Sequence, residues 1–203
     1  MELFAVFETW HLGDGNYPAV KKGQLVNLSF EVQPDELRLA PRESRFELDH
    51  LGQGTYRFTG LVTRVYDRGD QANPIVVIET ERFRFYMHSS RSETLALGKR
   101  RHRARNLLFD HYIWVEYLSS YPDPPDLFYS LRVTDIWRFR IPERFITRSE
   151  RGNAYPTWVR PEEYGPDDVS KVDVVSDEDF VNYVIQFSDD DVLSQTVART
   201  FLS

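Results

Sequence analysis

The sequence predicts a mainly β fold: a small barrel or a strongly twisted antiparallel sheet, followed by a C-terminal helical segment. Long runs of β-forming residues recur along the chain, and turn-forming residues separate them. Aromatic residues are dense, with 14 Phe, 11 Tyr and 4 Trp, and large rings favour strands and broad buried surfaces. With 203 residues and 41% hydrophobic content, the chain can bury one ordinary core, alone or with a small appendage.

The first strands are predicted from alternation. Residues 3–9 form the first expected strand. Residues 26–33 alternate strictly between apolar and polar side chains, which is typical of a strand with one buried face. Pro34 and Pro41 bracket a polar excursion, in which the strand pattern stops.

Four longer β-type runs follow, at residues 56–66, 75–87, 107–118 and 127–141. In the first of them the apolar phase slips after Val62, close to Gly60, which indicates a bulge or a sharp bend. Residues 75–78 are apolar on both faces, so we expect both faces to be covered. Residues 89–106 are expected to form a long insertion between strands.

The last quarter of the chain changes character. Residues 149–170 are rich in proline and glycine, which predicts an irregular connector after a β domain over residues 1–148. Residues 171–203 are predicted to be an acidic helical appendage that packs on the barrel. The acidic residues that follow Ser176 favour a helix start, because carboxylates stabilise the positive end of a helix dipole.

The strand pattern after Lys22 resembles an OB-type barrel. The resemblance lies in five or so strands, a bent early strand and an insertion between the third and fourth strands. It implies a fold class only, since one fold hosts many functions.

Composition excludes several kinds of chemistry and several locations. The chain has no cysteine, so disulfides, thiolate metal sites and thiol catalysis are impossible. The N-terminal residues lack a basic region, and Glu8 interrupts their apolar run, unlike a signal peptide. No apolar stretch approaches the roughly 18 residues of a membrane helix. These features predict a cytoplasmic protein without a membrane partner.

No catalytic, cofactor or metal-binding signature stands out. The glycine pairs at 13 and 15 and at 52 and 54 are interpreted as turns, since neither opens a phosphate-binding helix. No two of the five histidines have the i, i+4 spacing of a helical metal site. The sequence therefore predicts no cofactor, no metal and no catalytic residue, and it favours a binding module over an enzyme. A triad or metal site assembled from distant residues stays open.

An acidic segment supports the favoured function. Residues 162–191 contain eleven carboxylates and one lysine, in a chain whose net charge is −7. We expect a non-enzymatic module that acts through protein–protein interaction, such as an acidic inhibitor or immunity-type protein that docks a basic partner. Ordinary solubility and helix capping explain much of the same pattern. The residues predicted to contact the partner are Asp177, Glu178, Asp179, Asp189, Asp190 and Asp191.

A basic segment supports an alternative function. Residues 91–105 contain six cations and one carboxylate. Beside an aromatic-rich sheet, this composition is typical of single-stranded nucleic-acid binding. A solvated loop explains the charges equally well. The residues predicted to contact nucleic acid are Arg82, Arg84, Tyr86, Lys99, Arg100, Arg101, Arg103, Arg105 and Trp114.

Overall fold

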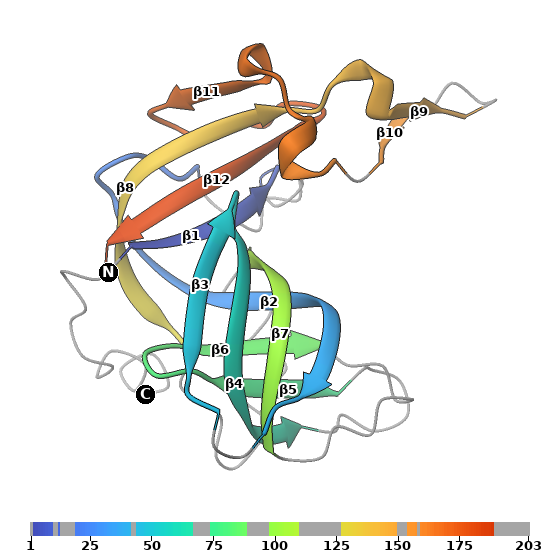
Figure 1. Ribbon diagram of the computed structural model, residues 1–203. Helices are drawn as coiled ribbons and strands as arrows, with labels where there is room; N and C mark the ends of the chain where they lie inside the picture. The colour runs from blue at the N-terminus through green and yellow to red at the C-terminus, as the bar shows by residue number, and fades with distance from the viewer. Residues whose placement is uncertain are drawn as a thin grey trace. The chain divides into compact units, whose positions relative to one another are not determined.

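The computed structural model describes residues 2–9, 12, 19–41, 44–66, 74–88, 98–109, 127–149, 154–157 and 159–188; for residues 34–39, 98–109 and 161 it describes the backbone alone. The described residues form two compact units (Figure 1). Unit 1 takes those within 1–26 and 130–192, and unit 2 takes those within 27–129. The sequence of unit 2 therefore interrupts that of unit 1.

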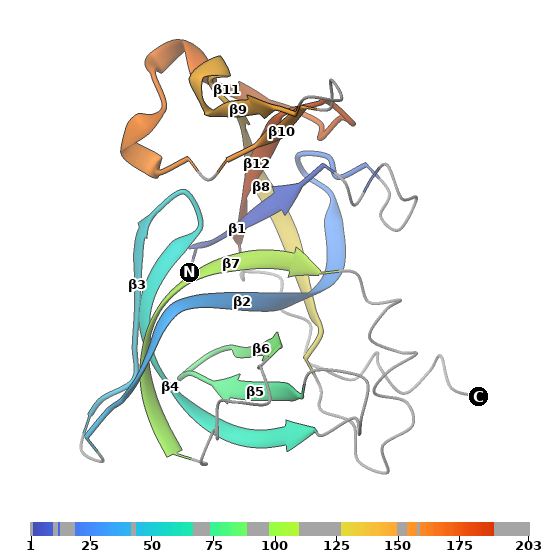
Figure 2. The same ribbon diagram turned by 90° about the vertical axis from the view of Figure 1, so that its right-hand side faces the viewer.

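Unit 2 is built around a nearly closed ring of strands (Figure 2). Antiparallel pairings join β4 to β5, β5 to β6, β4 to β7 and β7 to β2. One parallel residue pair, Glu31 with Tyr86, joins β2 to β6. A further strand, β3, pairs with the first half of β4. The bounds are β2 Leu25–Leu39, β3 Glu47–Gly52, β4 Thr55–Tyr66, β5 Ile75–Glu79, β6 Arg84–His88 and β7 Gly98–Phe109.

This ring confirms the predicted mainly β fold with a small barrel. In the cyclic order β4, β5, β6, β2, β7 it has a three-stranded antiparallel meander, one parallel step and two further antiparallel pairings.

Aromatic rings fill the inside of the ring of strands. Phe30, Phe58 and Phe85 are fully buried and come from β2, β4 and β6. The ring centroid of Phe85 lies 5.6 Å from that of Phe58 and 6.3 Å from that of Phe30. The apolar members of the alternation predicted for residues 26–33 are all buried, as expected, although the polar Ser29 is buried as well. Such rings exclude water and dominate the energy of a small core.

The predicted bend in β4 is confirmed at Gly60. The pairing of β4 with β5 shifts register between Val62 and Arg64. A Cβ atom at Gly60 would lie 2.5 Å from Cγ2 of Ile78 and 3.2 Å from the carbonyl oxygen of Glu79. Glycine is therefore needed because two strands approach closely where the barrel turns its corner.

Strand β5 is buried on both faces, as predicted. Val76 and Ile78 pair with Met87 and Phe85 of β6 and share the inward face. On the outward side a second apolar cluster covers the strand. It consists of Tyr66, Ile75, Val77, Tyr86 and Leu127, with Phe128 packed against it.

The prediction of one long strand over residues 75–87 is wrong, because a tight turn divides it into β5 and β6. The amide of Thr80 donates to the carbonyl of Phe83 at 2.8 Å, and the amide of Phe83 donates to Oγ1 of Thr80 at 3.0 Å. The polar residues between them allow the turn, while the apolar phase happens to continue through it.

The prediction of an insertion over residues 89–106 is also wrong in part. Residues 98–109 form β7, which pairs with β2 and β4. Likewise β2 continues past Pro34, with a register shift between Pro34 and Glu36 that accommodates the missing amide proton. Both segments are strands because they pair with neighbouring strands. Neither has the apolar alternation by which a strand is recognised in sequence.

Unit 1 is an antiparallel sheet in the order β11, β8, β12, β1. Its strands are β1 Glu2–Glu8, β8 Tyr129–Arg140, β11 Val169–Val172 and β12 Val181–Ser188. A separate hairpin joins β9 Ile146–Arg148 to β10 Ala154–Pro156. Single 3-10 turns lie at η1 Glu143–Phe145, η2 Pro161–Glu163 and η3 Pro166–Asp168.

The prediction of a helical appendage is wrong for the described part of residues 171–203. The segment expected to be the first helix is β12, which pairs with β8 on one side and β1 on the other. Tyr183, Ile185 and Phe187 alternate and lie opposite apolar residues of β1, so period two and not 3.6 governs the segment. Residues 189–203 lie outside the described residues.

No helix within the described ranges is long and apolar enough to cross a membrane.

Candidate functional site

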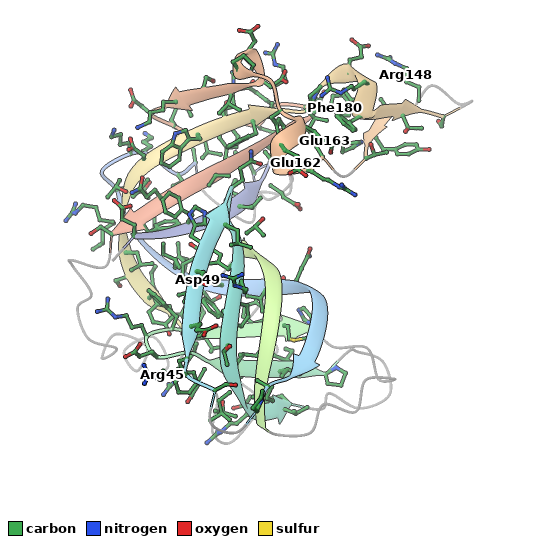
Figure 3. All side chains as sticks on the ribbon, in the orientation of Figure 1. Arg45, Asp49, Arg148, Glu162, Glu163 and Phe180 are labelled. Carbon is green, nitrogen blue, oxygen red and sulfur yellow. The ribbon has the colours of Figure 1, made fainter. Side chains whose placement is uncertain are left out.

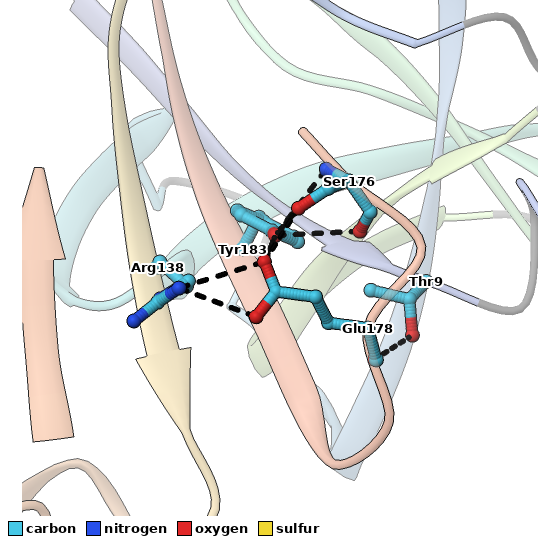
Figure 4. A network of polar contacts seen from close by, with 5 residues as sticks. All are labelled: Thr9, Arg138, Ser176, Glu178 and Tyr183. Atoms are coloured by element: carbon cyan, nitrogen blue, oxygen red, sulfur yellow. Dashed lines mark hydrogen bonds and ion pairs between the residues drawn. The ribbon is translucent and has the colours of Figure 1, made fainter. Parts of the chain in front are cut away.

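Residues 173–180 form a loop between β11 and β12, which we call the acidic loop. A polar network anchors its centre (Figure 4). The carboxylate of Glu178 accepts hydrogen bonds from Oγ of Ser176 at 2.5 Å and from the hydroxyl of Tyr183 at 3.3 Å. Nη1 of Arg138 forms an ion pair with the same carboxylate at 3.2 Å. Glu178 is thus turned toward the sheet and occupied within its own unit.

The backbone of the acidic loop is also held. Oγ1 of Thr9 donates to the carbonyl of Glu178 at 3.2 Å, and the amide of Ile141 donates to the carbonyl of Phe180 at 2.8 Å. Val175 is buried at 1% exposure and fixes the other end. These contacts hold the loop at both ends and at Glu178.

Phe180, labelled in Figure 3, ends the acidic loop. Its φ angle is 57°, in the left-handed region that residues with a side chain rarely adopt. Such a residue costs about 1–3 kcal/mol, and strain of this kind clusters at functional sites. The strain marks the acidic loop as a feature that the fold maintains against local preference.

The anchoring separates the predicted acidic residues. Asp177 and Asp179 flank Glu178 and are exposed, and among the described residues neither forms a hydrogen bond or an ion pair. The Glu178 carboxylate instead contacts Ser176, Tyr183 and Arg138. As a result, Asp177 and Asp179 are exposed on either side of Glu178, whose half-buried carboxylate is engaged by Ser176 and Arg138. Asp189, Asp190 and Asp191 lie outside the described residues.

The environment of Glu178 lowers the pKa of its carboxyl below the ordinary 4.5, chiefly through the hydrogen bond from Ser176 and also through the charge of Arg138. In the unfolded chain the pKa returns to its ordinary value. The stabilising contribution of Glu178 is therefore complete above about pH 4.5 and is lost as the pH falls through the lower, folded pKa.

Acid is accordingly expected to weaken unit 1 through Glu178. We expect Glu178→Gln to cost about 1–2 kcal/mol at neutral pH, because charge-assisted hydrogen bonds become neutral ones. Urea unfolding at several pH values should show that the wild type loses this advantage below about pH 4.5. Glu162→Gln, at an exposed carboxylate of the same unit, is the control and should follow the wild type. If Glu178→Gln has the same pH dependence as the wild type, the network does not stabilise the loop.

A second charged cluster fixes the segment before β2. Asp135 of β8 lies between Lys22, at 2.6 Å, and Lys171 of β11, at 3.0 Å. The hydrogen bond from Lys22, followed by that from Lys171, lowers the pKa of Asp135. Nζ of Lys171 also lies 5.0 Å from the ring centroid of Trp137. The cluster is satisfied by its own members, which indicates a structural role.

The predicted nucleic-acid residues are only partly brought together. Lys99, Arg100, Arg101, Arg103 and Arg105 all belong to β7. Tyr86 is fully buried in the outer apolar cluster, so it offers no surface on which a base could stack. Nε of Arg84 forms an ion pair with Glu79 at 2.9 Å, and Arg82 is exposed at the turn between β5 and β6. Trp114 lies outside the described residues.

The outward face of β5 and β6 is covered by other residues of unit 2. Its residues Ile75, Val77 and Tyr86 form one apolar cluster with Leu127, against which Phe128 packs. This face therefore offers few exposed rings.

No family model matches the sequence, and no curated protein or solved structure matches it either. No group of three His, Asp or Glu residues in the described part of the chain is placed to hold a metal ion. Among the histidines, His50 stabilises a turn, because its Nε2 accepts a hydrogen bond from the amide of Gly54 at 3.3 Å.

Proposed function

We propose that this protein is a non-enzymatic binding module that docks a basic protein partner through the acidic loop. The observation that carries the proposal is the exposure of Asp177 and Asp179 on either side of the anchored Glu178. A loop whose backbone is anchored before binding loses little conformational entropy when a partner arrives. Opposite charge on the partner speeds the encounter and selects against acidic proteins.

The acidic loop also offers apolar contact area. Val174, next to Asp173, is 41% exposed, whereas Val175 is buried. A protein interface combines such apolar contact with a charged rim. The loop thus supplies both elements within eight residues, from strands that hold it rigidly.

The proposal is tested by capture from an extract of the native source with four immobilised baits. These are the wild type, the charge reversal Asp177→Lys/Asp179→Lys, the control reversal Glu162→Lys/Asp167→Lys, and an empty matrix. The two double variants change the net charge equally, and all four altered residues are exposed in unit 1. A basic partner should be retained by the wild type and the control. Its retention by Asp177→Lys/Asp179→Lys should fall at least about tenfold, which corresponds to about 1.4 kcal/mol.

Thermal unfolding of each bait establishes that the loss does not come from misfolding. Equal retention of the partner by both double variants would show that the acidic loop is not the docking surface. Capture of no basic protein above the empty matrix, even at low salt, would contradict the proposal as a whole.

A further inference from the structure

The hairpin that joins β3 to β4 turns through a two-residue loop, Gln53 and Gly54. Gly52 pairs with Thr55 across this loop, and the register shifts between His50 and Gly52. The φ angles of Gln53 and Gly54 are 48° and 72°, and two positive values in succession are typical of a type I′ turn. Glutamine rarely adopts such a conformation, because its Cβ crowds the backbone carbonyl. The loop therefore closes against the preference of Gln53 and depends on other contacts.

One of these contacts is a hydrogen bond from the loop to a histidine. Gly54 lies in the loop and not in the β ladder, and it is buried. A buried amide without a partner costs free energy. Nε2 of His50 accepts the hydrogen bond of this amide at 3.3 Å. The bond requires a neutral imidazole with its proton on Nδ1, since a protonated ring has two N–H donors and no acceptor.

The surroundings of His50 on its own face of the hairpin are apolar and aromatic. Its ring centroid lies 5.0 Å from that of Tyr56, which is 2% exposed. The register with β7 places Ala104 next in the same row and His102 in the adjacent row. Burial of the imidazole lowers the pKa of His50 below its ordinary 6.5.

The charged residues of the hairpin and of the neighbouring part of β7 occupy the alternate positions: Glu47, Asp49, Arg57, Arg103 and Arg105. Alternate positions of a strand belong to opposite faces. Asp49 and Arg57 also form an ion pair with each other at 2.9 Å. In the unfolded chain the pKa of His50 returns to its ordinary value. The stabilisation from the bond to Gly54 is therefore complete above about pH 6.5 and is lost as the pH falls through the lower, folded pKa.

Strand β3 lies at an edge of the sheet, so the turn matters for its pairing. Within the described part of the chain β3 pairs with β4 alone, and none of its side chains is buried. The turn type fixes the register of a hairpin, so β3 can separate from β4 or slip along it once the loop is released. Segments with few buried contacts open at a low cost in free energy.

We propose that His50 is a pH-sensitive switch that controls the opening of the β3–β4 hairpin. While the ring is neutral, it accepts the hydrogen bond from Gly54 and keeps β3 paired. Uptake of a proton turns Nε2 into a donor, so two N–H groups face each other with no acceptor between them. The loop then opens, and Tyr56 loses its contact with the imidazole. The inference concerns unit 2 and does not depend on the acidic loop, which belongs to unit 1.

The test is amide hydrogen exchange of the full-length protein, followed by NMR at about pH 7.5 and about pH 5. Protection factors correct for the intrinsic effect of pH on exchange. The protection of Gly54 and of the β3 amides should fall at least about fivefold at the lower pH, because a buried amide loses its acceptor. The protection of Ile78 in β5 should not change. His50→Gln should keep the higher protection at both pH values, because its side-chain oxygen accepts and does not titrate.

His88→Gln is the matched control, since His88 is an exposed histidine of β6 in the same unit. This variant should show the same fall in protection as the wild type. Equal protection of Gly54 at both pH values in the wild type would overturn the proposal, and so would the same fall in His50→Gln. A pKa of His50 at or above 6.5 in an NMR titration of the wild type would contradict it as well. A fall that includes Ile78 would assign the effect to the barrel and not to the hairpin.

Discussion

Phe85→Ala is expected to cost about 3–5 kcal/mol of unfolding free energy, as is usual when a buried phenylalanine is truncated. Phe85 is fully buried, and its ring lies within 6.3 Å, between centroids, of the rings of Phe30, Phe58 and Phe83. Alanine would leave a cavity at the meeting point of three strands, and tightly packed rings relax poorly into such a space. Urea unfolding, followed by far-UV circular dichroism, measures the loss.

Phe46→Ala is the matched control for this substitution. The side chain of Phe46 is 37% exposed and lies in the same unit. Its truncation should cost under about 1 kcal/mol. If both variants lose the same stability, the rings around Phe85 do not form the core of unit 2.

Gly60→Ala is expected to destabilise unit 2 by about 1–3 kcal/mol, and Gly60→Val by more, because the added atoms overpack a closed corner. The new Cβ would meet Cγ2 of Ile78 at 2.5 Å, and the strands must separate to admit it. Gly52→Ala distinguishes this clash from backbone strain. Gly52 has a φ of 111° but no atom within 4 Å of its would-be Cβ.

A double-mutant cycle identifies the clashing atom. Ile78→Ala removes Cγ2. The double variant Gly60→Ala/Ile78→Ala should therefore be destabilised by much less than the sum of the destabilisations of the two single variants. Additive costs would show that the side chain of Ile78 does not make the contact. A Gly60→Ala variant as stable as the wild type would contradict the close approach altogether.

Sequence patterns predicted the barrel where one physical signal was strong. The alternation over residues 26–33, the apolar segment 75–78 and the glycine in β4 each pointed to the structure found. In all three segments, the local sequence and the tertiary packing favour the same backbone conformation. Because of that agreement, the secondary structure of a segment can be predicted from its own sequence before its partner strands are known.

Elsewhere the partner strand decided the outcome. Val181, Val184 and Ile185 are β-branched, which is a strand signal, but acidic residues before them imitate a helix start. Short apolar runs are ambiguous until a neighbour is known, and here the neighbour is β1, far away in sequence. Strand β7 was not predicted for the same reason. Its many charged residues hide the apolar alternation by which a strand is recognised in sequence.

The candidate sites likewise have one part that the local sequence predicts and another that depends on residues distant in sequence. Sequence alone grouped Asp177, Glu178 and Asp179. It could not show that Arg138 and Ser176 hold Glu178. The basic residues of β7 were named from their charge. Arg38 and Arg57 were not, because only the register places them beside β7.

The pairing of β1 with β12 has a consequence for biosynthesis. Glu2 pairs with Ser188, so the ribosome must add most of the chain before β1 can pair with β12. At about 5–20 residues per second, this pairing has to wait roughly 10–40 s. The inserted barrel has all its strands available well before that. During that interval the sheet of unit 1 is incomplete, and its apolar residues Leu3 and Phe7 lack their partners Phe187 and Tyr183.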